Sequence, residues 1–434
     1  MFLCAVVYNF ICAFIRSIAR FGYIPLKMEL DLHGSHRRAS KEILLEEHAS
    51  LVSSIKEKMT NTSDSGRICK VSEKFYKETE EIYFPRLVSI GPFHRGKERL
   101  KAMEERKWQY LNTLLLRAVN VEACITKCVE VLKMMEDRAR KCYEKERDMT
   151  SDEFVEMMLV DGCFIVELFY KSCCRGVRRR GDPFLATNQV FSNLRHDLIL
   201  LENQIPFFVL QYLFNLVPVP TQCGDCSLIE LAFRFFKKMV PDDPHDLRDK
   251  YGQEIHHLLD LIHQSFIPKT HMLRPEPNKP QSDQMNIPTA THLRKTGTRI
   301  KKTKSPSVFG VRFNNGALRI PALTHHDLME TVLRNLVAME NCCYDGAKYV
   351  TSYVFLMRNL IQSNEDAKIL HKKGIIDKEE EFVTLFGKIC VKVDPKDFYY
   401  GDLSEKLDGL KNPNISILYA RKARKYAVRC LRAL

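Results

Sequence analysis

An almost uninterrupted apolar stretch, residues 197–214 with the sequence DLILLENQIPFFVLQYLF, constrains the fold of this chain more than any other segment. A helix at a protein surface needs a single apolar stripe, whereas the apolar side chains of this stretch would cover a helix on almost every side. Pro206 suits the first turn of a helix and disfavours helical geometry at Ile205, so one helix should end and another begin here. The stretch therefore predicts two buried helical segments at the centre of the fold.

Three consecutive polar residues, Glu202, Asn203 and Gln204, interrupt the stretch shortly before Pro206. Polar groups are costly to bury unless they are hydrogen-bonded, and two helix ends leave backbone N–H and C=O groups without intrahelical partners. We interpret the three side chains as structural groups that satisfy this backbone. A catalytic role for the Glu202 carboxylate is the alternative interpretation.

Replacing Leu201 with alanine should lower the free energy of unfolding by about 2–5 kcal/mol, because a buried leucine loses its packing and leaves a cavity. That loss is a large share of the roughly 5–15 kcal/mol typical of a folded domain. Chemical denaturation of Leu201→Ala measures the change, and an unchanged midpoint would show that Leu201 lies outside the core.

Helical patterns dominate the rest of the chain, which is 434 residues long and 45% hydrophobic and can therefore bury a large core. Thr150 and Glu153 form a capping-box pattern, Thr324 and Asp327 suggest a second cap, and Trp108 belongs to a predicted buried helix face. The predicted helices cover residues 98–117, 121–142, 153–169, 227–239, 253–266, 327–340 and 344–361. We therefore expect a mainly α protein, built as a single large helical domain.

A small β-hairpin and a long loop are the predicted exceptions to this helical pattern. Apolar residues alternate over 309–313 and again over 318–320, and Asn314, Asn315 and Gly316 between them are typical of a hairpin turn. The residues before the hairpin are polar and rich in proline, which disfavours both helix and central strand. We therefore assign residues 268–306 to a loop.

The chain is basic, with a formal net charge of +13, and much of that charge lies in two runs. The last 24 residues hold seven basic and no acidic residues, and a second run lies within 294–304. Such runs are usually solvated surface; an anionic membrane surface is the next interpretation, and nucleic acid is unlikely as a partner because no reading motif accompanies them. Fifteen cysteines without the regular spacing of a disulfide scaffold favour a reducing compartment.

Sequence composition suggests four regions. Residues 1–27 form a hydrophobic N-terminal extension, whose apolar run is shorter than the roughly 20 residues of a spanning helix. Residues 28–67 are polar, 68–410 form the helical domain, and 411–434 form a basic C-terminal helix. Met28 could serve as the start in place of Met1.

Two short motifs suggest chemistry but lack the residues that the chemistry needs. The segment 91–97 has the spacing of a phosphate-binding loop, with Asp161 as a potential magnesium ligand, but Glu98 replaces the required hydroxyl and Pro92 removes one N–H. Cys223 and Cys226 have the spacing of a zinc knuckle without a second pair. Cys173, Cys174, His245, His256 or His257 would have to complete such a site.

The adjacent pairs His325-His326, Cys342-Cys343 and His196-Asp197 are not expected to converge, because neighbours on a helix point in different directions. We assign no catalytic, cofactor-binding or metal-binding residues and expect no cofactor.

Several blocks of the sequence resemble the plant family known as domain of unknown function 247. They occur in the order IYFPRLVSIGPFHRGKERLKAMEERKWQYL, MMLVDGCFIVELF, DLILLENQIPFFVL, IPALT and YVTSYVFLMRNLIQSNEDAKILHKKGII. The resemblance implies a largely helical plant protein held at the plasma membrane by a C-terminal helix that follows basic residues. It also implies a relation to members that determine grass self-incompatibility, and it supplies no catalytic residues.

The basic run from Arg421 to Arg432 resembles the segment that precedes the membrane helix in this family, but no apolar span follows it up to Leu434. Membrane attachment is then expected through the N-terminal run or the basic tail, with the bulk of the chain cytoplasmic; a soluble cytoplasmic protein is the alternative.

We predict a non-enzymatic protein that recognises an unknown protein partner in signalling at or near the plasma membrane. One alternative is an enzyme that uses Asp161 and Glu202 as an acid–base pair. The other is nucleic-acid binding through the basic runs.

Overall fold

The computed structural model describes residues 68–409, except for 77–79, 145–147, 178–181, 183–186, 225, 238, 241–254, 268–284, 306 and 390–392. The predictions for residues 1–67 and 411–434 therefore lie outside the described residues, as does His245. The described residues belong to one compact unit, and the protein is mainly α, as the sequence predicts.

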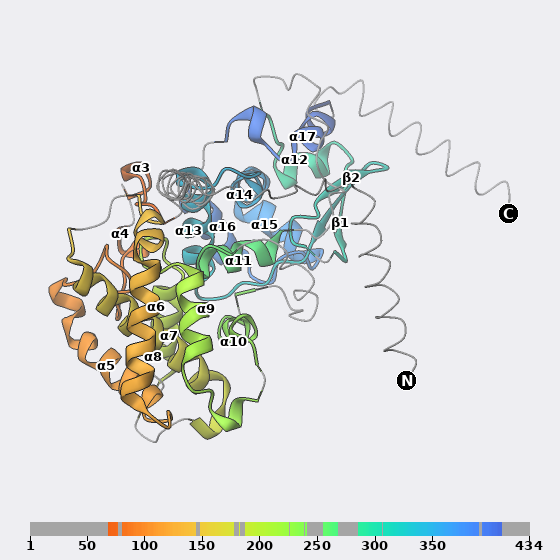
Figure 1. Ribbon diagram of the computed structural model, residues 1–434. Coiled ribbons are helices and arrows are strands. Elements are labelled where there is room, and N and C mark those ends of the chain that lie inside the picture. Colours follow the sequence, from red (N-terminus) through yellow and green to blue (C-terminus); the bar gives the residue numbers. More distant parts are fainter. Residues whose placement is uncertain are drawn as a thin grey trace, which may run out of the picture. The chain divides into compact units, whose positions relative to one another are not determined.

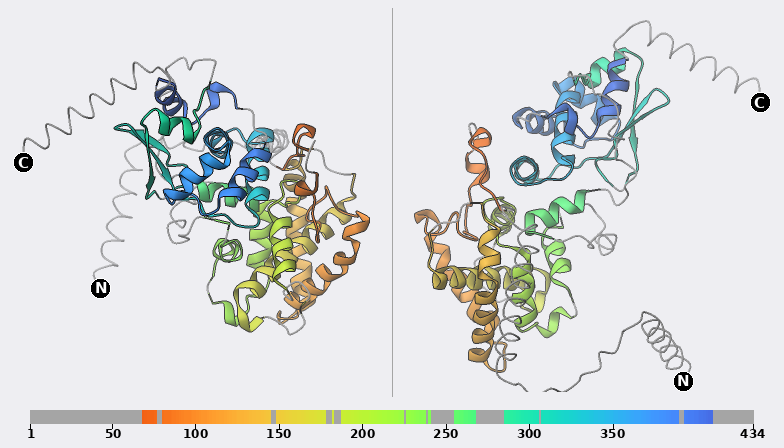
Figure 2. Two further views of the ribbon diagram at one scale, coloured as in Figure 1. Left: turned by 180° about the vertical axis from the view of Figure 1, so that it is seen from behind. Right: turned by 45° about the horizontal axis from the view of Figure 1, so that its top comes forward.

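The helices of the first half of this unit lie side by side (Figures 1 and 2). They are α3 (Glu73–Tyr76), α4 (Glu80–Tyr83), η1 (Glu98–Leu100), α5 (Lys101–Leu115), α6 (Val121–Lys141), α7 (Ser151–Cys173), η2 (Arg175–Val177), α8 (Asn188–Leu198), α9 (Phe207–Leu216), η4 (Thr221–Cys223) and α10 (Leu228–Phe235). The remaining helices are α11 (Leu258–Phe266), α12 (Ala290–Lys295), α13 (Met329–Cys342), α14 (Tyr349–Leu360), α15 (Asn364–Lys372), α16 (Glu379–Lys388), η7 (Pro395–Asp397) and α17 (Gly401–Asp408).

Helix α7 is the most deeply buried element of the first half. Every described residue from Met157 to Lys171 is buried, and α5, α6, α9 and α10 all pack against this helix. The predicted capping box is present, because the Thr150 side chain accepts from Glu153 N and the Glu153 side chain accepts from Thr150 N. Gly162 permits the close approach of α9, since a Cβ atom there would collide with Leu213.

The apolar stretch 197–214 is buried, but its first helix ends earlier than its composition suggests. Helix α8 ends at Leu198, residues 199–206 form turns and extended chain, and α9 begins directly after Pro206. The prediction that a helix begins at Pro206 is confirmed, but the prediction that the preceding helix ends there is wrong, because eight non-helical residues separate the two helices. The run from Ile199 to Leu201 is buried without being helical.

Two of the three polar side chains, Asn203 and Gln204, donate hydrogen bonds to carbonyl groups at and just after the end of α8. Asn203 Nδ2 donates to the carbonyl of Asp197 at 2.9 Å, and Gln204 Nε2 donates to the carbonyls of Leu198 at 2.9 Å and Leu200 at 2.8 Å. Gln204 Oε1 accepts from Leu259 N at 3.3 Å, which ties the junction to α11. The interpretation of these side chains as partners of the backbone is confirmed.

The sheet contains the predicted hairpin and one strand that the sequence analysis missed. Strands β2 (Arg312–Asn314) and β3 (Ala317–Pro321) pair antiparallel, and both turn residues, Asn315 and Gly316, have positive φ. Strand β1 (Arg299–Thr303) pairs parallel with β3, so the order is β1-β3-β2. The assignment of the whole range 268–306 to a loop was therefore wrong, since α12 and β1 lie within it.

Two side-chain predictions on helices were also wrong. Trp108 is 45% exposed, whereas Tyr110, Leu111, Leu114 and Leu115 of the same predicted face are buried. Thr324 and Asp327 do not cap α13, which begins at Met329 after Leu328 without a side-chain cap.

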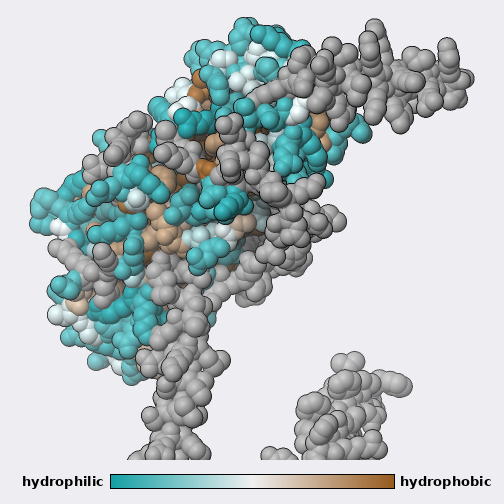
Figure 3. All heavy atoms as spheres, turned by 90° about the horizontal axis from the view of Figure 1, so that it is seen from above, coloured by the Kyte–Doolittle hydropathy of each residue, from teal (hydrophilic) through white to brown (hydrophobic). Residues whose placement is uncertain are grey.

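The described surface is mainly hydrophilic, with apolar side chains gathered near the middle of the face in Figure 3. Large apolar side chains are also exposed on the outer helices, among them Leu116, Met134 and Tyr212. Within the described part of the chain, no helix combines the length and apolar character needed to cross a bilayer.

Asn203→Leu should lower the free energy of unfolding by about 3–5 kcal/mol, because it leaves several buried backbone groups without partners. Urea denaturation measures the loss. Asn215→Leu is the matched control on exposed surface and should change stability by about 0.5 kcal/mol or less. Equal effects of the two substitutions would contradict a structural role for Asn203.

Candidate functional site

Asp161, one half of the acid–base pair considered from the sequence, is buried on α7 with both carboxylate oxygens engaged. Oδ2 accepts from Gly91 N at 2.9 Å, and Oδ1 accepts from Lys107 Nζ at 2.5 Å. The Lys107 ammonium also donates to the Ser89 carbonyl at 2.9 Å and lies 2.9 Å from Glu104 Oε1. Burial raises the pKa of the Asp161 carboxyl group, and the Lys107 charge opposes that increase. Asp161 thus joins α5 and α7 to the extended segment 85–91.

Asp197 holds the other end of the same extended segment. Its carboxylate accepts three backbone N–H groups, from Arg86 and Leu87 at 2.7 Å each and from Val88 at 2.9 Å. His196 Nδ1 also lies 2.9 Å from Asp197 Oδ1. The expectation that this adjacent pair would not meet was wrong, because the pair occupies the last turn of α8, where one carboxylate can serve several groups.

Glu202, the second half of the considered pair, lies against the first described residues of the chain. Its Oε1 accepts from Val71 N at 2.8 Å, and its Oε2 lies 3.5 Å from His94 Nε2. His94 is 3% exposed. Burial, followed by the positive charges of Lys97, Arg99 and Lys70, lowers the pKa of His94 to about 3. A neutral imidazole therefore faces the Glu202 carboxylate at neutral pH.

The geometry gives Asp161 and Glu202 architectural roles. Each accepts a backbone N–H from a different segment, and neither lines the cavity beside α8 and α13 or the cavity beside α12 and β1. An acid–base pair would need both carboxylates at one open cavity.

The loop 91–97, which has the spacing of a phosphate-binding loop, also makes structural contacts within the fold. Gly91 has a φ of 72° and already donates its N–H to Asp161. A Cβ atom at this position would collide with the carbonyl oxygen of Gln204. Gly91 is therefore explained by backbone geometry and by the close approach of the junction before α9.

Two of the cysteines weighed as zinc ligands meet as a disulfide. Cys174 and Cys223 are bonded, with a Cα–Cα distance of 5.6 Å. Cys226 Sγ accepts from Arg234 at 3.1 Å, and Cys173 Sγ donates to the Leu231 carbonyl at 3.5 Å. Among the described residues no group of three or more metal-ligating side chains comes together.

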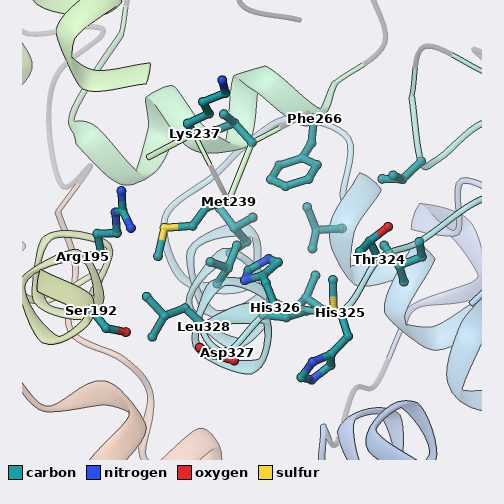
Figure 4. A pocket seen from close by; sticks show the side chains of 18 of the residues that line it. Ser192, Arg195, Lys237, Met239, Phe266, Thr324, His325, His326, Asp327 and Leu328 are labelled. Atoms are coloured by element: carbon teal, nitrogen blue, oxygen red, sulfur yellow. The ribbon is translucent and has the colours of Figure 1, made fainter. Parts of the chain in front are cut away.

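A cavity of about 1050 Å³ lies elsewhere, between α8, α11, α13 and α14. Apolar side chains form much of its lining; they include Met239, Phe266, Phe309, Val332, Leu336 and Tyr353. Figure 4 shows the His326 imidazole near the middle of the cavity, while His325 and Lys237 turn away from it. Burial, followed by the charge of His325, lowers the pKa of His326 to about 4, so this ring is neutral at pH 7.

Arg195 supplies positive charge at the wall of this cavity. Its Nε donates to the Phe235 carbonyl at 2.7 Å, and its guanidinium lies 4.2 Å from the ring centroid of Phe191. No carboxylate of the described residues forms an ion pair with it. Burial lowers the pKa of this guanidinium. Its remaining N–H groups and its uncompensated charge suit an incoming anion.

This arrangement suits binding more than chemistry. Ser192, His326 and Asp327 all line the cavity, but no hydrogen bond joins them, so they do not form a nucleophile–base–acid relay. The sequence analysis did not single out Arg195 or the cavity, because its walls come from segments more than 100 residues apart. Of the residues that line the cavity, the sequence pointed only to the adjacent histidines, His325 and His326. Their side chains point in different directions, as predicted.

Sequence comparisons identify the class to which this helical protein belongs. The family described as plant protein of unknown function, domain of unknown function 247, matches residues 68–434, and the chain belongs to it. A relative from Arabidopsis thaliana, UPF0481 protein At3g47200, is 30% identical over 71% of this chain and 68% of its own length. The putative UPF0481 protein At3g02645 of the same plant is 24% identical over 68% of this chain and 72% of its own length. No solved structure matches significantly.

Acidification should destabilise the protein below about pH 6.5 through His94. Its pKa in the fold, about 3, lies below the ordinary value of 6.5, so the unfolded chain binds the proton first and stability falls as the pH decreases between these values. The loss by about pH 4 should be on the order of 2–3 kcal/mol.

Urea denaturation across this pH range measures the effect. His94→Gln removes the titrating group and should flatten the profile, whereas replacement of the exposed His292 by glutamine should leave the profile unchanged. Parallel profiles for the protein and His94→Gln would contradict the assignment.

Proposed function

We propose that this protein is a non-enzymatic recognition protein that acts in plant signalling at the plasma membrane. Its partner is a protein segment that presents a bulky apolar side chain beside a carboxylate. The observation that carries the proposal is the cavity of about 1050 Å³, in which a largely apolar lining meets the guanidinium of Arg195. An apolar anchor with an adjacent ion pair is a common arrangement at the centre of protein interfaces.

Two further observations support recognition in preference to catalysis. The buried carboxylates Asp161, Asp197 and Glu202 accept backbone N–H groups, so their charge is used to hold the chain in place. The cavity side chains with catalytic potential do not form a hydrogen-bonded relay. The membrane location and a relation to self-incompatibility determinants rest on the sequence blocks shared with the family.

Selection from a displayed library of random peptides on the immobilised full chain tests this proposal. We expect enriched peptides to carry Asp or Glu within one helical turn of a bulky apolar residue. Arg195→Gln should weaken their binding by about tenfold or more, because it removes a charge-assisted hydrogen bond. Ala322→Trp, at an exposed position on the cavity rim, should block entry and weaken binding to a similar degree.

Arg106→Gln and Ala102→Trp are matched controls at exposed positions of α5 and should bind like the parent protein. Equal binding by the cavity variants and the parent would refute the assignment of this cavity. Turnover of a defined substrate by the purified protein, lost on changing Glu202 or Asp161, would overturn the non-enzymatic proposal. Imaging of a tagged protein in plant cells tests the location separately.

A further inference from the structure

A second cavity, of about 430 Å³, has more basic residues than any other kind in its lining. It lies where the end of α12, strand β1 and the end of α15 meet. Five of its eight lining residues are basic, and none is acidic: Arg294, Arg299, Lys301, Lys302 and Lys373. Thr298 and two buried isoleucines, Ile300 and Ile369, complete the lining.

The fold, and not local sequence alone, assembles this group. The turn after α12 passes through Gly297, whose φ is 82°, and leads directly into β1. Ile300 packs into the core and so fixes the register in which Arg299 and Lys301 remain exposed. Helix α15 packs against α12, and Asp366 at its start accepts from Thr291 N at 2.7 Å, which brings the basic end of α15 to the cavity.

The positive charge in this cavity is not compensated within the described part of the chain. None of the five basic side chains forms an ion pair with a described residue, and the Arg299 guanidinium donates to the Asn315 carbonyl at 2.8 Å. The strand register adds a row of like charges across the sheet, from Lys301 through Arg319 to Arg312. Like charges directly opposite each other destabilise a sheet, so an anion that binds here stabilises the fold.

Protection of a sheet edge explains only part of this pattern. Strand β1 is an edge strand, and charged side chains on edge strands prevent pairing with other chains. That explanation covers Arg299, Lys301 and Lys302. It does not cover Arg294 and Lys373, which reach the same concavity from two helices.

We propose that this basic pocket binds a phosphorylated inositol ring that carries several phosphate groups. Guanidinium groups bind phosphate through paired hydrogen bonds, and ammonium groups add point charges. The pocket has the volume of a small ring and not of an extended strand, and no aromatic side chain lines it for base stacking, which argues against nucleic acid. The same chemistry occurs on membrane lipids and on free inositol phosphates. The membrane form of this proposal rests on the proposed function; the pocket itself does not.

Binding measurements on the full chain distinguish a lipid headgroup from a free inositol phosphate as the ligand. One arm measures soluble inositol hexakisphosphate by calorimetry. The other measures co-sedimentation with phosphatidylcholine vesicles that contain phosphatidylinositol bisphosphate, with phosphatidylserine vesicles of equal surface charge for comparison. Binding of the bisphosphate vesicles above the phosphatidylserine vesicles assigns the site to a lipid headgroup. Binding of the soluble ligand alone assigns it to a free inositol phosphate.

The double variant Arg294→Gln with Lys373→Gln should weaken binding of whichever ligand the parent protein binds, the soluble inositol phosphate or the bisphosphate vesicles, by about tenfold or more. Lys101→Gln with Lys127→Gln removes the same charge from exposed positions of α5 and α6 and should have an effect of less than about twofold. Thermal unfolding of both double variants checks that each is folded.

Three outcomes would contradict the proposal that this pocket binds a phosphorylated inositol ring. They are equal weakening by the two double variants, equal binding of phosphatidylserine and bisphosphate vesicles without binding of the soluble ligand, and tighter binding of single-stranded RNA than of either ligand. Failure of the peptide selection leaves these measurements unaffected, so the two proposals fail independently.

Discussion

The fold depends on one unusual solution to a general constraint, which is that every buried backbone N–H needs an acceptor. The non-helical segment 85–91 runs into the core at Val88, Ser89 and Ile90, and it pairs with none of the described strands. Its N–H groups are taken instead by side chains: Asp197 accepts three, Asn203 accepts that of Ile90 at 2.7 Å, and Asp161 accepts that of Gly91. Because these acceptors lie on α7 and on the junction between α8 and α9, the segment ties these helices together.

This solution also explains why the buried carboxylates are poor candidates for catalysis. Asp197 accepts three backbone N–H groups, and Asp161 and Glu202 accept one each, so the loss of any of these carboxylates leaves backbone donors unsatisfied. The groups with available binding capacity are found at cavities: Arg195 beside an apolar lining, and five cations around the smaller pocket. Both sites fit recognition, one of a protein segment and the other of a phosphorylated ring, and they occupy different elements of the same compact unit.

Local patterns explain which predictions succeeded. The capping box at Thr150, the start of α9 after Pro206 and the hairpin turn at Asn315 and Gly316 each depend on residues close in sequence. The predictions that failed concern competition among distant segments. Trp108 is exposed because the core side of α5 is decided by contact with α7, and α12 and β1 form within a predicted loop because β3 and α15 supply partners for them.

The sequence by itself determined a mainly helical protein with a buried junction before Pro206, because apolar periodicity, proline geometry and capping residues act locally. Membership of the plant family domain of unknown function 247 followed from shared sequence blocks. The sequence also determined that Glu202, Asn203 and Gln204 need partners, although it could not name them. Only the tertiary structure decided that these partners include Val71, Ile90 and Leu259, and that Lys373 joins the basic run around Arg294. Such pairings depend on how helices pack across more than 50 residues of sequence, and side-chain spacing within one segment carries no record of them.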